Sequence, residues 1–141
     1  MKLIMRPEGV AGDAPWTPAY LEQSATDARK FLNECQYEHA VQQVLSLCEE
    51  EDPSHPTLVD VDAVDEFHEL RDKHGVLGNV NLRVFFWICK PHKLIVVLGA
   101  WNKNVEGKTP VRIVKRIKWR KRHAERLVME HYKEKELERK R

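Results

Sequence analysis

Apolar residues in the first third of the chain recur mainly at a helical period. Residues 2–5 can form a short first strand, and residues 9–15 are predicted to be a loop because glycine, aspartate and proline crowd together there. Thr17 followed by Pro18 is typical of a helix N-terminus, so a first helix is expected to begin here. Its apolar positions are Leu21, Ala25, Ala28 and Leu32. The same spacing predicts a second helix at Tyr37, Val41, Val44, Leu45 and Cys48.

The pattern changes to a period near two in the middle of the chain. From Thr57 on, Val59 and Val61 alternate with Asp60 and Asp62, and the extended character resumes over 67–71. The runs 82–89 and 94–98 are β-branched and aromatic, which favours strands buried on both faces. The Thr-Pro pair at 109–110 then indicates the start of a long helix. Its mostly apolar stripe contains Val114, Ile117, Ala124, Leu127, Val128 and His131.

These elements predict an α+β fold in which two N-terminal helices pack on a small antiparallel sheet, followed by a long basic C-terminal helix. At 141 residues the chain has room for one domain. We place that domain at residues 1–132. Residues 133–141 are almost wholly charged, and we expect them to be a solvated or partner-dependent helical tail.

Charge is distributed unequally along the chain. Residues 1–70 hold 4 Lys+Arg and 15 Asp+Glu, whereas residues 71–141 hold 20 and 7, so the second half is expected to bind a polyanion. Three cysteines far apart indicate neither a disulfide framework nor a zinc site, and a reducing cytoplasm is the expected location. The longest apolar run, 94–101, is far shorter than the ~20 residues that cross a bilayer, so neither membrane insertion nor export is expected.

Three short motifs carry a resemblance to a known toxin family. They are Glu69-Leu70-Arg71, Leu82-Arg83-Val84-Phe85-Phe86, and the segment 94–103 followed by Lys108-Thr109-Pro110. Their order and spacing resemble those of the RelE/ParE toxin superfamily, nearest to its HigB-like, phage-derived branch. The resemblance covers residues 57–126. The chain departs from the family pattern at Asn104, where a second lysine is usual, and it lacks a tyrosine at the end of the strand.

The family resemblance implies a chemistry for the basic residues. Cleavage of RNA by its own 2′-hydroxyl needs a proton acceptor, a proton donor and positive charge at the phosphate, and it needs no metal or other cofactor. Arg83 is our first choice for the phosphate, with Arg71 on the neighbouring strand, because guanidinium groups bind phosphate through two parallel hydrogen bonds. The further catalytic candidates are loop lysines and histidines that titrate near neutral pH: Lys103, Lys108, His68, His74 and His92.

Candidate RNA-binding residues lie at the end of the last strand and on the last helix. They are Trp101, Arg112, Lys115, Arg116, Lys118 and Arg120. The tryptophan could stack on a base, and the basic side chains would bind phosphates through counterion release. Two simpler interpretations stay open: Arg71 could form a surface ion pair with Glu69 or Asp72, and Trp101 could belong to the edge of the core.

The resemblance implies a toxin of a type II toxin–antitoxin system, and more specifically a ribosome-dependent, metal-independent mRNA endoribonuclease (mRNA interferase) that inhibits translation. The expected partners are a cognate antitoxin, held in a toxin–antitoxin hetero-oligomer, and messenger RNA on the ribosome, with no membrane. Two alternatives remain open at this point. One is a ParE-like poison of DNA gyrase; the other is a non-catalytic relative that only binds nucleic acid or a partner.

Overall fold

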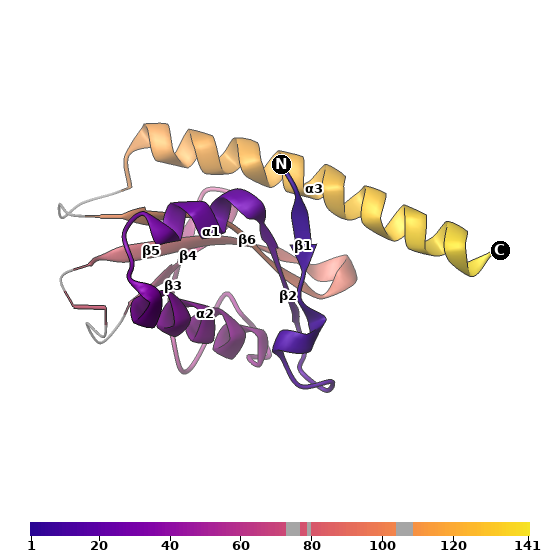
Figure 1. Ribbon diagram of the computed structural model, residues 1–141, viewed down its shortest axis with the longest axis horizontal. Helices are drawn as coiled ribbons and strands as arrows, with labels where there is room; N and C mark the ends of the chain where they lie inside the picture. The colour runs from indigo at the N-terminus through magenta and orange to yellow at the C-terminus, as the bar shows by residue number, and fades with distance from the viewer. Residues whose placement is uncertain (73–76, 79, 104–108) are drawn as a thin grey trace.

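Figure 1 shows the computed structural model of the chain, which describes residues 1–72, 77–78, 80–103 and 109–141. These residues form six strands, three α-helices and two short 3-10 turns. In chain order the elements are β1 (Leu3–Met5), η1 (Pro7–Gly9), β2 (Thr17–Leu21), α1 (Glu22–Arg29), α2 (Glu34–Cys48), β3 (Asp60–Val64), β4 (Phe67–Arg71), β5 (Leu82–Cys89), η2 (Lys90–His92), β6 (Leu94–Asn102) and α3 (Val111–Arg139).

The strands of the described residues form one sheet in the order β1-β2-β6-β5-β4-β3. Strands β3 to β6 make an antiparallel meander, and β1 is antiparallel to β2. Strand β2, however, runs parallel to β6. The predicted α+β class and the long C-terminal helix are therefore confirmed. The prediction of a small antiparallel sheet is wrong, because the sheet is larger and mixed, and two strands rather than one precede the helices.

Residues 17–21, which were expected to open the first helix, form β2 instead. Pairing with β1 on one side and with β6 on the other outweighs the local capping signal. The backbone N–H of Thr17 donates to the carbonyl of Lys93 on the β6 side, so the nitrogen of Pro18 faces the β1 side. Opposite Pro18, the N–H of Arg6 donates to the Pro18 carbonyl at 3.0 Å, and the Arg6 carbonyl accepts from the N–H of Gly9 at 3.1 Å, so the missing N–H of proline leaves no acceptor unpaired. The first helix then begins at Glu22.

Helices cover both faces of the sheet. Helices α1 and α2 pack on one face and α3 on the other, and Figure 1 shows α2 and α3 on opposite sides of the strands. One core cluster joins Leu47 of α2 to Phe86 of β5. The other joins Ile117 of α3 to Phe85, the neighbour of Phe86 on the same strand. Both faces of β5 are therefore packed in a core, as its apolar sequence predicts.

Helix α1 takes the place of a strand beside the second half of β6. Strand β2 pairs with β6 only as far as Val97, and α1 follows directly. Asp27 of α1 accepts a hydrogen bond from the backbone N–H of Ala100 (3.3 Å), and Arg120 of α3 donates one to the carbonyl of Leu98 (3.1 Å). The two side chains, 14% and 10% exposed, meet at 2.6 Å. This buried ion pair supplies hydrogen bonds that another strand would otherwise give to β6.

Gly99 lies against this ion pair. A Cβ atom at this position would lie 2.6 Å from the side chain of Ile117 and 2.7 Å from Nη1 of Arg120. Such contacts are far inside van der Waals distance, so glycine is what allows α3 to approach β6 this closely.

Helix α3 continues to Arg139, and its C-terminal end projects beyond the rest of the molecule (Figure 1). The last buried residue of the helix is Val128, and residues 133–141 are all exposed. No helix in the described parts of the chain is both long and apolar enough to cross a membrane.

Candidate functional site

Neighbouring strands bring three of the predicted site residues together. Arg71 of β4 lies opposite Arg83 of β5, and Arg83 lies opposite Trp101 of β6. Directly opposed residues place their side chains on the same face of a sheet, so the three form one row. The expected proximity of the two arginines is confirmed.

A buried carboxylate holds the two arginines. Oε1 of Glu69, a residue only 3% exposed, lies 2.8 Å from Nη2 of Arg71 and 3.9 Å from Nε of Arg83. The hydroxyl of Thr109 donates to Oε2 of the same carboxylate at 3.3 Å. Asp62 of β3 adds a second carboxylate, 2.6 Å from Arg71. We call Asp62, Glu69, Arg71 and Arg83 the arginine cluster.

Ion pairing uses most of the hydrogen-bonding capacity of Arg71. The side chain contacts both Glu69 and Asp62 and remains 32% exposed. Partial burial acts to lower the pKa of Arg71, but the hydrogen bonds and negative charge of Glu69 outweigh it and raise the pKa overall. The ion pair that was the simpler interpretation of Arg71 is therefore present, with Asp62 as the second partner rather than Asp72.

Arg83 is held less completely, although it is buried more deeply. Its side chain is 11% exposed, and Nη1 donates to the side-chain oxygen of Asn81 at 2.6 Å. Its Nε is buried and has no hydrogen-bond partner among the described residues. Burial lowers the pKa of Arg83, and the charge of Glu69 offsets only part of that effect. A buried cationic donor without a partner is costly, and an anion would satisfy it.

Asn81 connects Arg83 to the end of β6. Its side-chain amide donates to the carbonyl of Lys103 at 2.7 Å, and its own carbonyl accepts from the Lys103 N–H at 2.8 Å. These two bonds fix the Lys103 backbone close to the arginine cluster, and the role of its side chain at the phosphate stays a prediction. Lys108, the other predicted lysine, lies outside the described residues.

Trp101 is half-buried and already in contact with other rings and charges. The edge of Phe31 meets its ring at a centroid distance of 6.2 Å, and the guanidinium of Arg112 lies 5.1 Å from the ring centre. The position at the edge of the core fits the simpler interpretation of Trp101. A base could stack here only by displacing Arg112 or by using the remaining part of the ring.

The predicted histidines do not join the arginine cluster. His92 lies in η2, at the opposite end of β5 from Arg83. That separation is about 20 Å along the strand, at roughly 3.3 Å per residue. Its ring stacks on Tyr132 of α3 with centroids 3.8 Å apart. His92 is therefore not placed to act on a phosphate held by Arg83.

His68 occupies the other face of β4. Its ring stacks on Phe86, on the α2 side of the sheet, and burial lowers its pKa. His74 lies outside the described residues. Among the described residues, the proton-accepting groups in direct contact with the arginines are therefore the carboxylates of Glu69 and Asp62. From the sequence we expect only an ion-pairing role for Glu69 and none for Asp62.

Ion pairing also divides the basic residues of α3. Lys118 and Lys121 contact Glu66, at the turn between β3 and β4, at 3.5 and 2.9 Å. Arg120 is buried in its pair with Asp27, which removes it from the candidate RNA-binding residues. The side chain of Arg120 faces the sheet, so it is not accessible to RNA.

The opposite side of α3 carries positive charge around an exposed tryptophan. Trp119 is 61% exposed, and the ring of His123 stacks beside it with centroids 5.7 Å apart. At about 100° per residue, the neighbouring basic residues lie within roughly 60° of Trp119 around the helix axis. No acidic residue of α3 precedes Glu125. The exposed residues of this outer face are Arg112, Lys115, Arg116, Trp119, Arg122 and Arg126.

The outer face retains three of the predicted RNA-binding residues, Arg112, Lys115 and Arg116. Trp119 was missed, although its spacing of three and four residues from Arg116 and Lys115 would have placed it on the same helical face. Basic side chains with an aromatic ring between them are the combination that binds single-stranded nucleic acid.

No group of three or more His, Cys, Asp or Glu side chains in the described ranges is arranged to hold a metal ion. No protein-family model matches the chain, and no curated protein is significantly similar to it. The arginine cluster and the outer face of α3 are the two sets of basic side chains that could bind a phosphate backbone.

Proposed function

We propose that the protein is a RelE/HigB-like toxin of a type II toxin–antitoxin system that cleaves messenger RNA on the ribosome. One observation carries this proposal: Arg83 is buried beside Arg71 and Glu69, yet its Nε has no hydrogen-bond partner among the described residues. A phosphate bound between the two arginines would supply the missing acceptor. Arg71, which is 32% exposed, marks the side from which the phosphate would enter.

The proposed reaction is internal attack within the RNA. The 2′-oxygen forms a bond to phosphorus while the bond from phosphorus to the 5′-oxygen breaks, leaving a 2′,3′-cyclic phosphate. Arg83 and Arg71 would stabilise the extra negative charge of the transition state. Asp62, whose side chain is 58% exposed, would accept the 2′-hydroxyl proton, and the ammonium of Lys103 would donate a proton to the leaving oxygen.

The outer face of α3 would hold the RNA that leads to this site. Its first residue, Arg112, lies against Trp101, which pairs with Arg83 across the strands, so the outer face begins next to the arginine cluster. From Arg112 to Arg126 the helix rises by about 21 Å, at 1.5 Å per residue. Phosphates along this length would be bound by charge and one base by stacking on Trp119.

The same charges would bind the expected antitoxin. An acidic segment placed on the arginine cluster would compete directly with the phosphate, because both need the same guanidinium groups. Inhibition would then follow from occupancy alone, without a conformational change.

Expression of the wild type and of Arg83→Ala in a bacterial host, with primer extension on a translated message, tests the proposal. The wild type should arrest growth and produce discrete cleavage sites. The variant should lose about 10²- to 10³-fold of the cleavage rate, as is usual when one stabilising donor of the transition state is removed. Arg139→Ala, which removes an exposed arginine at the far end of α3, is the matched control and should cleave like the wild type.

Equal arrest by the wild type and Arg83→Ala without transcript cleavage would exclude the nuclease. If that arrest came with a DNA-damage response, the gyrase-poison alternative would replace it.

A non-catalytic nucleic-acid-binding relative is the second candidate, and one observation favours it. Arg71 is already held by two carboxylates, and the candidate histidines His68 and His92 contact other residues away from the cluster. In that case overexpression would be harmless, and the purified protein would bind RNA without cutting it.

A further inference from the structure

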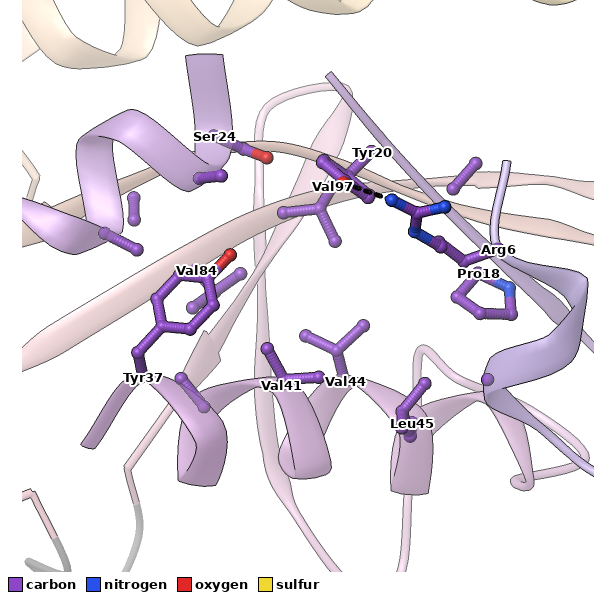
Figure 2. A pocket seen from close by; sticks show the side chains of 16 residues that line it. Arg6, Pro18, Tyr20, Ser24, Tyr37, Val41, Val44, Leu45, Val84 and Val97 are labelled. Carbon is purple, nitrogen blue, oxygen red and sulfur yellow. Dashed lines mark hydrogen bonds between the residues drawn. The ribbon is translucent and has the colours of Figure 1, made fainter. Parts of the chain in front are cut away.

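A cavity of about 290 Å³ lies between α2 and the sheet, on the face of the sheet opposite α3. Figure 2 shows Val41, Val44 and Leu45 side by side on α2, with Val84 and Val97 of the sheet facing them across the space. Tyr37, one turn before Val41, extends from the same helix into the cavity. The lining is almost entirely aliphatic and aromatic.

Small side chains create this space. Those that contribute are Ser24, Ala25 and Ala28 of α1, Ala40 of α2 and Ala100 of β6. The hydroxyl of Ser24 is already used, since it donates to the carbonyl of Leu21 at 2.7 Å. Folded cores contain few voids larger than one water molecule, and an apolar cavity of this size tends to take up apolar molecules. The volume is close to the lower end of the range of about 300–1,000 Å³ for small-molecule pockets.

One rim of the cavity carries a positive charge. In Figure 2 the side chain of Arg6 extends along this rim toward Tyr20, and its guanidinium donates to the tyrosine hydroxyl at 3.3 Å. The Arg6 side chain is 52% exposed, and its ion pair with Glu8, whose side chain is 66% exposed, is long at 3.6 Å. Such a pair is weak, so Arg6 can accept another anion.

We propose that this cavity binds a small amphipathic carboxylate, with its alkyl or aryl part among the valines of α2 and its carboxylate on Arg6. The apolar interior favours the alkyl or aryl part of the ligand. The guanidinium of Arg6 at the rim favours a carboxylate over an alcohol or amine of the same length. At roughly 30 Å³ per water-sized group, the cavity holds about ten such groups. A chain of about ten carbons therefore matches it in size.

Decanoate and decanol, each added to the purified full chain below the micelle concentration, test the two halves of this proposal. Isothermal titration should show one decanoate bound per chain and weaker binding of decanol. Arg6→Gln should weaken decanoate about 10-fold or more and leave decanol unchanged. Arg139→Gln, which removes an exposed arginine at the C-terminal end of α3, is the matched control and should change neither.

Filling the cavity separates binding inside it from binding elsewhere on the surface. Ala40→Leu should abolish binding of both ligands. Val41→Trp is the second filling variant, because Val41 is 38% exposed and a larger side chain there can cover the opening without entering the core. Full binding by a folded filling variant would overturn the proposal, as would an Arg6→Gln variant that binds decanoate like the wild type.

A second copy of the chain is the competing occupant of the cavity. Sedimentation of the protein alone should show a monomer whose mass decanoate does not change. A dimer that decanoate dissociates would assign the cavity to self-association and overturn the proposal.

Discussion

Two arginines of this molecule are buried to nearly the same extent, but their charges are paired to different degrees. The side chain of Arg120 is 10% exposed, and its Nη1 meets both Asp27 at 2.6 Å and the carbonyl of Leu98 at 3.1 Å. The side chain of Arg83 is 11% exposed, but its nearest carboxylate oxygen is 3.9 Å away and its Nε lacks a hydrogen-bond partner among the described residues. Ion pairing and hydrogen bonds offset the cost of burying the charge of Arg120, but they offset that cost only partly at Arg83.

The difference separates structure from function. A buried ion pair whose two members also bond the backbone holds elements together, and here it joins α1, α3 and the edge of β6. An incompletely paired cation weakens the fold, and a bound anion that completes its hydrogen bonds would remove that cost.

The largest expected effect is on stability, at Arg120. Arg120→Met should lower the free energy of unfolding by about 3–5 kcal/mol, because it leaves Asp27 buried without its partner. Lys118→Met breaks a more exposed ion pair and should cost less than about 1 kcal/mol. Urea denaturation of both variants measures the difference. Equal losses of unfolding free energy would show that the Arg120–Asp27 pair does not stabilise the fold more than an exposed ion pair does.

Arg83→Lys should affect cleavage more than folding. The substitution keeps the positive charge but removes the planar fork and its unused donor. Loss of one hydrogen bond to a charged group, about 1.5–3 kcal/mol, corresponds to a cleavage rate about 10- to 100-fold lower. Thermal unfolding run in parallel should show a smaller change than in Arg120→Lys. A larger loss of thermal stability in Arg83→Lys than in Arg120→Lys would show that Arg83 stabilises the fold as well.

The same contrast exists between neighbours on α3, since Trp119 is exposed where Arg120 is buried. Trp119→Ala should weaken binding of a short single-stranded RNA by about 1–3 kcal/mol, the usual contribution of one stacked base. Stability should not change. Met129→Ala removes another exposed apolar residue of the same helix and serves as the control in a fluorescence-anisotropy titration. Equal affinities for both variants would remove Trp119 from the interface.

The smallest expected effect concerns His68, which lies on the face of β4 opposite Glu69. Its pKa is lowered by burial, so the unfolded chain binds a proton more readily than the folded one. The resulting stability should be fully present above about pH 6.5, the ordinary histidine value, and should be lost as the pH falls through the lowered pKa. His68→Phe, which can keep the stacking on Phe86, should flatten this part of the curve of unfolding free energy against pH. Parallel curves for both proteins would assign the dependence to other groups.

Local patterns were sufficient to predict most of the secondary structure. Helix α2 and strands β4, β5 and β6 lie where their apolar periods place them, because each period reports which faces are buried. The helix predicted for segment 17–21 is wrong for a physical reason: threonine and proline fit a helix start, and they also fit a strand in which the missing N–H of proline leaves no acceptor unpaired. Its pairing with Leu94 joins positions 77 apart in the sequence, which no local pattern contains.

The candidate site was predictable only in part for a similar reason. Motif spacing was enough to place Arg71 beside Arg83, since adjacent strands of a meander have predictable neighbours. Arg120 could not be distinguished from the other basic residues of α3, because its burial depends on Asp27, far away in the sequence. His92 has the right chemistry but lies at the wrong end of β5, which residue type alone does not reveal.

The ion pair at the edge of β6 also affects whether the molecule associates with other protein chains. Unused N–H and C=O groups along a strand are a template on which another chain can add its own strand, and natural proteins protect such edges. Asp27 and Arg120 occupy these groups beyond the point where β2 ends. A chain that loses either side chain would therefore expose a polymerisation surface, and its failure in the cell would be aggregation as well as unfolding.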